Sequence, residues 1–390
     1  MKPAIYLDYA ATAPVRPEVL EAMLPFLGPT FGNPSSAHRF GRAARAGLEQ
    51  ARREIAQALG AEPSQVIFTS GGTEADNLAI IGSALAARDR GAPMRVAVSA
   101  IEHKAILAAA HAVAHLGGEE EQIAVTSDGL VDLDAVDQAL ARRPACVSVM
   151  WVNNEVGTVQ PVAEVAERCR AAGVTFHTDG VQAVGKVPVN LVDLPGVLMT
   201  ISGHKLGAPK GVGALIVRER KAVDAIIHGG GQQFGIRPGT ENVAGAVALG
   251  RAVALAVKEQ EANTAHCAAL RDRLAERLRA AVPDVVINVE RAPRAPHVLS
   301  LCVPGADSEA LLMHLDLAGV AASSGSACST GAVEPSHVLT AMGVPRELAL
   351  GAVRFSVGRE TTEAEIDRAA EVFPAVVAKV RQLAGVLGRA

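Results

Sequence analysis

The sequence is short of aromatic residues, of closely spaced cysteines and of long apolar runs, and each shortage excludes a class of protein. Aromatic side chains make up 3% of the 390 residues, and the five cysteines include no CxxC pair. An odd number of scattered cysteines argues against a disulfide framework or a cysteine zinc site. No run approaches the roughly 18 apolar residues that a membrane span needs, and no apolar signal segment opens the chain.

Charge is nearly balanced, with 37 basic and 41 acidic residues and a net charge of −4. A balance of this kind indicates neither a nucleic-acid partner nor a membrane partner. Hydrophobic residues make up 49% of the chain, as in ordinary globular enzymes. We therefore expect a cytoplasmic enzyme whose thiols stay reduced.

Short apolar runs alternate with helical patterns between about residues 65 and 220. This alternation predicts an α/β fold with a mostly parallel sheet between helices. The 3.6-residue spacing of apolar residues predicts helices over 73–86, 132–141 and 161–172. The expected strands are Val66–Thr69, Arg95–Ser99, Cys146–Val152, Thr175–Thr178, Leu198–Ser202 and Gly213–Val217.

The pattern changes beyond about residue 255, where one long helix is expected over Val253–Ala281. A chain of this length exceeds one core, so we predict two domains. The large domain is expected over residues 15–255, and a small α+β domain over residues 1–14 with 256–390. The strands expected in the second part are Val285–Val289, Val298–Val303, Gly319–Ala322 and Gly351–Ser356, before a final helix from Thr362.

Polar residues follow several of the expected strands, where ligands bind in α/β folds. The turn SGGTEADN (70–77) has glycine amides and a helix start that can hold a phosphate, although a plain capped turn has the same composition. His103 and Asn154 also follow strands, although a helix cap and a turn former explain them equally well. Asp179 ends one strand, and Lys205 follows the next; burial there would lower the lysine's pKa, although most such lysines lie on the surface. A phosphate turn, a carboxylate and a lysine are together the set that a pyridoxal 5'-phosphate (PLP) site needs.

The segment SSGSACSTGAVEPS (323–336) surrounds Cys328 with small and polar residues that cannot bury its thiol. The other four cysteines lie on expected strands or helices, where a free cysteine usually acts as a small hydrophobe. A weakly packed loop suits a thiol that must reach a cofactor and then another protein. An exposed cysteine present by chance would have the same surroundings.

A series of sequence blocks from residue 5 to about 370 resembles the NifS/IscS-type cysteine desulfurases, PLP enzymes of fold type I in the class V aminotransferase group. The blocks include YLDYAAT, FGNPSSAHRFG, FTSGGTEADNLAI, EHKAIL, VNNEVGTVQPV, HTDGVQAVGK, SGHKLGAPKGVGAL, RPGTEN, SSGSACSTGAVEPSHVL and VRFSVGR. The resemblance implies a large PLP-binding domain with a mostly parallel seven-stranded sheet between helices, plus a smaller α+β domain. It also implies a homodimer that converts L-cysteine to L-alanine.

The resemblance carries roles to individual residues. Lys205 resembles the Schiff-base lysine, Asp179 the partner of the ring nitrogen, and Gln182 the donor to the ring hydroxyl. His103 resembles the ring-stacking proton carrier, and Asn154 and Arg354 the groups that hold the substrate carboxylate. The residues implied to contact the cofactor are Gly72, Thr73, His103, Asn154, Asp179, Gln182, Ser202, Gly203, His204, Lys205 and, across the dimer, Thr240.

Cys328 resembles the family's nucleophile, which takes the sulfur as a persulfide and passes it to an acceptor protein. The acceptor would be an iron–sulfur scaffold, a nitrogenase-specific scaffold or a tRNA-thiolation relay. Cys328 would act as a metal ligand only toward iron–sulfur, through its persulfide in a scaffold complex.

Four positions depart from the family pattern, and three other functions compete with desulfuration. Ala13 stands where a second threonine is common, Gly180 where alanine is usual, and Gln233 and Phe234 where Glu and Arg are common. The competing functions are a selenocysteine lyase, another PLP-dependent class V transaminase, and a thiol carrier without enzyme activity. A transaminase would not need Cys328, and a thiol carrier would be colourless.

Overall fold

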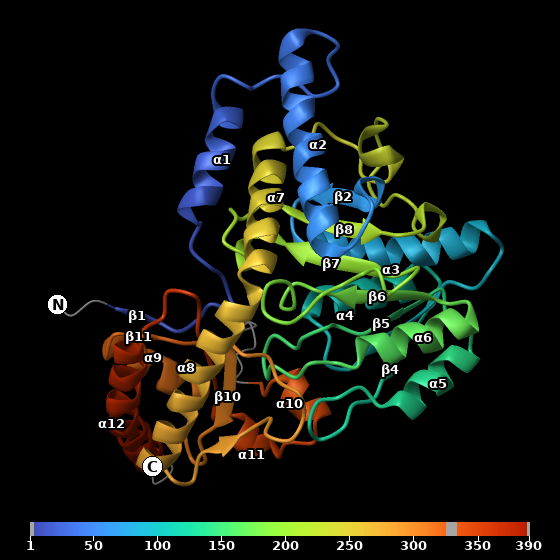
Figure 1. Ribbon diagram of the computed structural model, residues 1–390. Coiled ribbons are helices and arrows are strands. Elements are labelled where there is room, and N and C mark those ends of the chain that lie inside the picture. Colours follow the sequence, from blue (N-terminus) through green and yellow to red (C-terminus); the bar gives the residue numbers. More distant parts are fainter. Residues whose placement is uncertain (1–3, 325–333, 388–390) are drawn as a thin grey trace.

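The computed structural model describes residues 4–324 and 334–387, and a seven-stranded sheet forms its centre (Figure 1). The strand order is β2-β8-β7-β6-β5-β3-β4. β8 runs antiparallel to β2 and β7, and the remaining neighbours are parallel, so the expected mostly parallel sheet is confirmed. The strands are β2 (Val66–Thr69), β3 (Arg95–Ser99), β4 (Glu119–Ile123), β5 (Cys146–Ser148), β6 (Thr175–Asp179), β7 (Leu198–Ser202) and β8 (Gly213–Val217).

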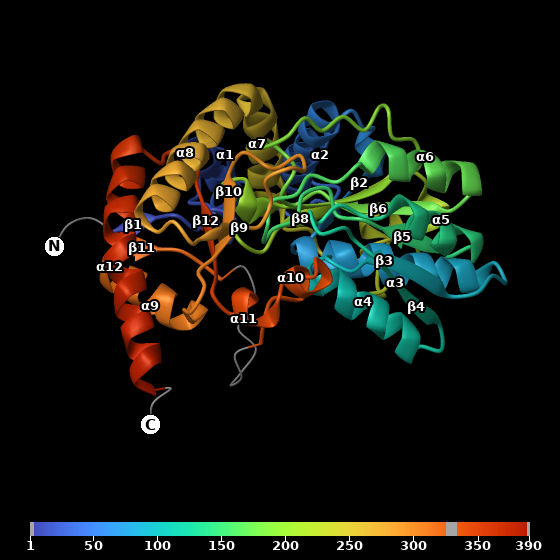
Figure 2. The ribbon, with the colours of Figure 1, turned by 90° about the horizontal axis from the view of Figure 1, so that it is seen from below.

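Helices cover both faces of this sheet (Figure 2). On one face α3 and α4 bury apolar side chains such as Leu78 and Ile106 against the strands. On the other face α2, α5, α6 and α7 pack with the strands in the largest apolar cluster, which α1 extends. These helices are α1 (Pro17–Leu27), α2 (Arg39–Leu59), α3 (Gly72–Asp89), α4 (Lys104–His115), α5 (Leu133–Ala141), α6 (Val162–Ala172) and α7 (Val243–Lys258).

The edge strand β4 is absent from the strands expected from the sequence, because its residues EEEQI are almost all polar. Most of its side chains are exposed, and it pairs in parallel with β3 alone. Arg95 of β3 forms an ion pair with Glu119 at 2.8 Å. Charged side chains on an edge strand oppose pairing with another chain. A search for apolar runs therefore finds the buried strands and misses this exposed one.

Two expected elements have different lengths in the structure. The strand expected over Cys146–Val152 stops at Ser148, and Val152 makes only an isolated bridge to Val159. The single helix expected over Val253–Ala281 is wrong: α7 ends at Lys258, and α8 (Gln260–Ala281) begins after a break at Glu259. Arg16 donates to both carboxylate oxygens of Glu259, at 3.0 and 2.9 Å, and so fixes the position of the break.

A second apolar cluster lies beside the large sheet and combines residues from both ends of the chain, such as Leu7 and Phe355 (Figure 1). It supports the predicted division into residues 15–255 and residues 1–14 with 256–390, which stays a prediction. Short strands in this part form the sheets β12-β10-β9 and β1-β11. The elements are β1 (Ile5–Tyr6), α8, β9 (Val286–Ile287), β10 (Val298–Cys302), α9 (Ser308–Leu317), β11 (Val320–Ala321), α10 (His337–Ala341), α11 (Arg346–Ala349), β12 (Ala352–Ser356) and α12 (Glu363–Leu387).

No helix in the described ranges combines the length and apolar character that crossing a bilayer requires.

Candidate active site

A cavity of about 420 Å³ lies where the sheet's strand ends meet the β12 side of the second cluster. Because β3, β5, β6 and β7 are parallel, the segments that follow them meet at one edge, and β12 adds a wall from the other end of the chain. The cavity is lined by Ala10, Ala11, Gly72, Thr73, Asp76, His103, Met150, Asn154, Asp179, Val181, Gln182, Ser202, His204, Lys205, Ser323 and Arg354.

Most of the residues that the sequence predicted for the site therefore line one cavity. Three do not. Gly203 is buried behind the lining, where a Cβ would lie 2.9 Å from Val212. Thr240 is exposed and lies outside this cavity, and Cys328 lies outside the described residues.

Lys205 lies in the short 3₁₀ turn η2 (Gly203–Lys205) directly after β7. Its Nζ donates to the carbonyl oxygens of Ala10 at 2.7 Å and Ala11 at 2.6 Å. Burial, followed by the nearby Arg354 cation, lowers the pKa of Lys205 to about 8. A lysine with such a pKa is partly uncharged near neutral pH and can act as a nucleophile or a base.

Asp179 ends β6 with a carboxylate that lines the cavity and is 5% exposed. Its Oδ1 accepts from the backbone N–H of Val181 at 2.8 Å. Burial raises the pKa of Asp179 above its usual value, although His103, the Val181 N–H and Lys205 act to lower it. A buried carboxylate in this position suits a cationic ring N–H as its partner.

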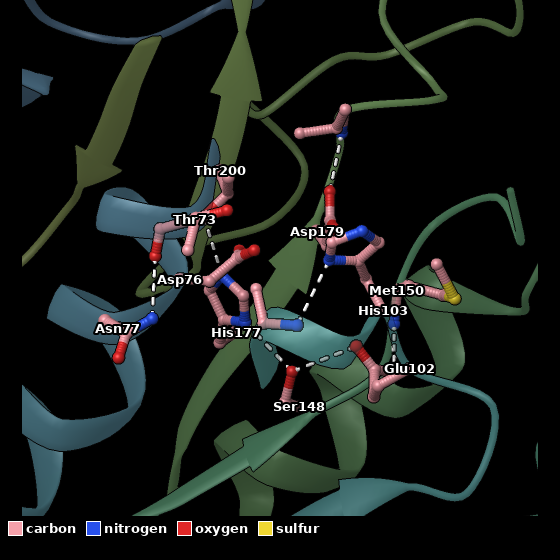
Figure 3. A network of polar contacts seen from close by, with 12 residues as sticks. Thr73, Asp76, Asn77, Glu102, His103, Ser148, Met150, His177, Asp179 and Thr200 are labelled. Atoms are coloured by element: carbon pink, nitrogen blue, oxygen red, sulfur yellow. Dashed lines mark hydrogen bonds and ion pairs between the residues drawn. The ribbon is translucent and has the colours of Figure 1, made fainter. Parts of the chain in front are cut away.

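His103 is the N-cap of α4, and Figure 3 shows its ring beside Asp179. Its Nδ1 accepts from the backbone N–H of Ala105 at 3.1 Å, which leaves Nε2 to carry the proton of the neutral ring. Burial lowers the pKa of His103, so the ring is neutral near pH 7. The residue therefore caps a helix and also lines the cavity, and its role in the chemistry stays a prediction.

A chain of buried polar groups continues from the cavity into the protein (Figure 3). The ring of His177 bonds Thr200 Oγ1 at 3.0 Å through Nε2 and Ser148 Oγ at 2.9 Å through Nδ1. Ser148 in turn lies 3.5 Å from Glu102 Oε2. Asp76, whose Oδ1 has no hydrogen-bond partner among the described residues, lies 3.8 Å from His177 and faces the cavity.

The start of α3 faces the cavity through Gly72 and Thr73. The N-cap Gly71 has no side chain that could bond the amides of the first turn. Free amides at a helix start attract an anion, and the helix dipole adds to this attraction. A Cβ at Gly72 would lie 3.4 Å from the Cβ of Ser202, so these two predicted phosphate contacts are neighbours.

Arg354 of β12 is almost fully buried at the wall of the cavity. It donates to the carbonyl oxygen of Asn154 at 2.7 Å and to Asp8 Oδ1 at 2.7 Å. Its buried Nε has no partner among the described residues. The guanidinium therefore keeps donor capacity for a carboxylate.

The departures from the family pattern have local partners. A Cβ at Gly180 would lie 3.0 Å from Met199, whose side chain occupies the space of the more usual alanine. Gln233 accepts at Oε1 from the amide of Phe68 at 3.0 Å and from Arg52 at 3.2 Å. Phe234 lies 4.0 Å under the guanidinium carbon of Arg220.

Sequence reasoning missed three groups that matter for the site. The carbonyls of Ala10 and Ala11 hold Lys205 although they lie nearly 200 residues away in the sequence. Asp76 enters the cavity one helical turn after Gly72 and Thr73, and this i+3, i+4 spacing could have revealed it.

In the described residues, no three His, Cys, Asp or Glu side chains form a possible metal site.

Known proteins match this chain over nearly its whole length. The model of the family described as Aminotransferase class-V matches residues 5–369. The cysteine desulfurase IscS of Dictyoglomus turgidum is 43% identical over 383 residues, 98% of this chain and 97% of the relative. The cysteine desulfurase of Gluconacetobacter diazotrophicus is 43% identical over 382 residues, 97% of this chain and 95% of the relative.

Solved structures agree with the sequence relatives. A NifS-like protein superposes with a TM-score of 0.89 at 33% identity and covers 96% of this chain and 100% of its own. A structure described as SspA in complex with cysteine has a TM-score of 0.79 at 31% identity, over 92% of this chain and 100% of its own.

The fold and the cavity define a class V aminotransferase-type enzyme, in a family that depends on PLP. Within that class, the chain belongs to the cysteine desulfurases of the IscS/NifS type.

Proposed function

We propose that this chain binds PLP in the described cavity, converts L-cysteine to L-alanine and takes the sulfur as a persulfide on Cys328. The observation that carries the proposal is the meeting of the Lys205 amine and the buried Asp179 carboxylate in one cavity. Membership of the cysteine desulfurases supports the choice of substrate, and the solved neighbour with bound cysteine agrees with it.

The residues of the cavity fit the cofactor by their chemistry. The amides at the start of α3, with Thr73, Ser202 and His204, would hold the phosphate. Asp179 would pair with the ring nitrogen, and the second N–H of Gln182 is available for the ring hydroxyl, because the first bonds Ala10. When bound, PLP supplies a carbonyl carbon for the amines of Lys205 and substrate and an electron sink for the α-carbon.

Lys205 would also move the substrate's α-proton. Because burial lowers its pKa to about 8, the Nζ is able to take up a proton near neutral pH and return it later. His103, neutral because burial lowers its pKa, would serve as the second proton carrier at its Nε2. These two side chains enter the cavity from different elements, η2 and the start of α4.

Arg354 would orient the substrate through its carboxylate. Arg354 and Asn154 both line the cavity, and only two of the five guanidinium N–H groups are used by Asn154 and Asp8. A guanidinium fork fits a carboxylate through two parallel hydrogen bonds, which fixes the orientation of the bound amino acid.

The chain leading to Cys328 starts at the cavity wall. Ser323 lines the cavity and exchanges backbone hydrogen bonds with Arg354 at 3.1 and 2.6 Å. Cys328 follows Ser323 by five residues and itself lies outside the described residues. As its thiolate attacks the substrate's sulfur, an S–S bond forms and the C–S bond breaks; the electron pair stays on carbon, and protonation there gives alanine.

The partners and the compartment also belong to this proposal. Thr240 is exposed in the single chain. A residue that completes the phosphate site of a second subunit must be exposed in this way, so we propose a homodimer. The persulfide would pass to an iron–sulfur scaffold or another sulfur-acceptor protein. Cys328 must be a free thiol before it takes up sulfur, so we place the reaction in the cytoplasm, where thiols are kept reduced.

The test is the formation of alanine and of reducible sulfur from L-cysteine by the purified protein. We expect a yellow holoenzyme, loss of both products in Lys205→Ala and in Cys328→Ala, and normal activity in the control Cys169→Ala, which removes a buried thiol of α6. Retained desulfuration in Cys328→Ala would favour the transaminase alternative. A colourless protein would favour a thiol carrier, and a higher kcat/KM for selenocysteine a selenocysteine lyase.

A further inference from the structure

The side-chain amide of Gln182 stands between the cofactor cavity and a second, smaller cavity of about 120 Å³. Its Nε2 donates to the Ala10 carbonyl at 2.9 Å, the same oxygen that accepts from Lys205 at 2.7 Å. Its Oε1 accepts from Lys186 Nζ at 3.0 Å and lies 3.2 Å from His297 Nε2. The proposed donor to the cofactor is thus fixed by contacts on both sides.

An amide can be turned end for end, and its partners decide which end faces the cavity. The carbonyl of Ala10 accepts only, so it requires the NH₂ group on its side. On the other side, neutral His297 adapts to either orientation by changing its tautomer, and its Nδ1 has no partner among the described residues. When charged, Lys186 donates only and cannot adapt, whereas its neutral amine could also accept. The Ala10 carbonyl and the charged Lys186 therefore both oppose the reversed amide.

The backbone of Lys186 is held in position independently of Gln182. Its carbonyl oxygen accepts from Thr264 Oγ1 of α8 at 2.9 Å. Its side chain also lines the second cavity, together with Lys205, Cys267 and His297. Burial, then repulsion by Lys205, lowers the pKa of Lys186 to about 7, so the charged form that opposes the reversed amide predominates below pH 7.

We propose that Lys186 is a positioning residue that locks the amide of Gln182 with its N–H groups toward Ala10 and the cofactor's ring hydroxyl. This role rests on the proposed function, because it presupposes PLP in the neighbouring cavity. It extends the site by one layer, to a lysine that touches neither substrate nor cofactor.

The test uses the holoenzyme without substrate and follows the pH midpoint of the cofactor's visible absorption band. Loss of a hydrogen bond to the ring oxygen disfavours the deprotonated form, so we expect Lys186→Met to raise the midpoint by about half to one pH unit and to speed cofactor release. Lys186→Arg keeps a cation and N–H donors beside a cavity with room for them, so its midpoint should lie close to that of the wild type. The control Lys210→Met removes an exposed cation from the loop after Lys205 and should leave the midpoint unchanged.

A double-variant comparison separates positioning from simple charge. If Lys186 acts through the amide, Lys186→Met has no further effect once Gln182→Ala has removed that amide. An equal shift in both backgrounds, or no shift in either, overturns the proposal. Should Lys186→Met fail to fold, Lys186→Gln in the two backgrounds gives the same comparison. A wild-type protein without a cofactor band overturns the proposed function too, whereas an active yellow enzyme with no shift overturns only the role of Lys186.

Discussion

Glu102 offers a direct test of how burial controls charge next to the site. The side chain is fully buried, and burial raises its pKa from 4.5 to about 8. Its Oε1 accepts from the Met150 amide at 2.7 Å, and Oε2 lies 3.5 Å from Ser148 Oγ (Figure 3). Oε1 also accepts from Ser99 at 2.8 Å. Replacement by glutamine keeps the shape and lets the same oxygen accept both hydrogen bonds, while its NH₂ donates to Ser148. The substitution therefore removes the titration and little else.

The sign and the magnitude follow from proton linkage. The folded-state pKa is raised, so the stability that Glu102 contributes is fully present below pH 4.5 and is lost as the pH rises toward 8. Between pH 5 and pH 9 the wild type should lose about 4 kcal/mol relative to Glu102→Gln. For a chain of 390 residues the unfolding entropy is about 0.8 kcal/mol per kelvin, so the difference in Tm should change by about 5 °C.

Scanning calorimetry of both holoenzymes at pH 5, 7 and 9 measures this change. The Tm of Glu102→Gln minus the Tm of the wild type should increase as the pH rises. The exposed Glu276→Gln on α8 is the control, and its Tm difference from the wild type should stay nearly constant. A constant difference for Glu102→Gln as well would refute the claim that this carboxyl is held protonated in the folded protein.

Three further predictions follow from the site and its packing. Asp179→Asn should lower kcat for L-cysteine by about 100-fold or more, because an amide cannot stabilise a charged ring N–H; a steady-state assay that finds near-normal kcat would contradict the proposed pairing. Arg354→Lys should raise KM for L-cysteine by about 10-fold, because an ammonium cannot replace a fork that also bonds Asp8; an unchanged KM would remove this residue from substrate binding. Gly250→Ala should cost about 1–3 kcal/mol of stability, because the new Cβ would lie 2.8 Å from Ala51 Cα where α7 crosses α2; chemical denaturation that shows no loss would mean the helices can separate there.

Local sequence patterns predicted the buried strands of the large sheet well. The strands β2, β3, β7 and β8 have the predicted limits, because buried strands of a covered sheet are continuous apolar runs bounded by turn residues. The same logic failed for the polar edge strand β4, whose pairing with β3 is a tertiary event. It also failed at Glu259, where an ion pair with Arg16 positions the break between two helices of uninterrupted helical composition.

The types and order of the site residues were likewise readable from the sequence. Asp179 and Lys205 stand at the ends of predicted strands, and parallel strands bring their ends to one edge. The contacts that adjust these residues were not readable. Lys205 is held by carbonyls of the N-terminal segment, which lies nearly 200 residues away in the sequence, and any residue can supply a carbonyl.

The sequence by itself thus determined the class of fold, the family and the identity of the reactive side chains, because these depend on residue type and on order along the chain. Only the tertiary structure decided how buried each group is and which distant atoms surround it. Those two quantities set the pKa of Lys205, the orientation of Gln182 and the position of Lys186 behind it. Desolvation and hydrogen bonding act over a few ångströms in space, and a linear sequence does not record which residues folding brings within that distance.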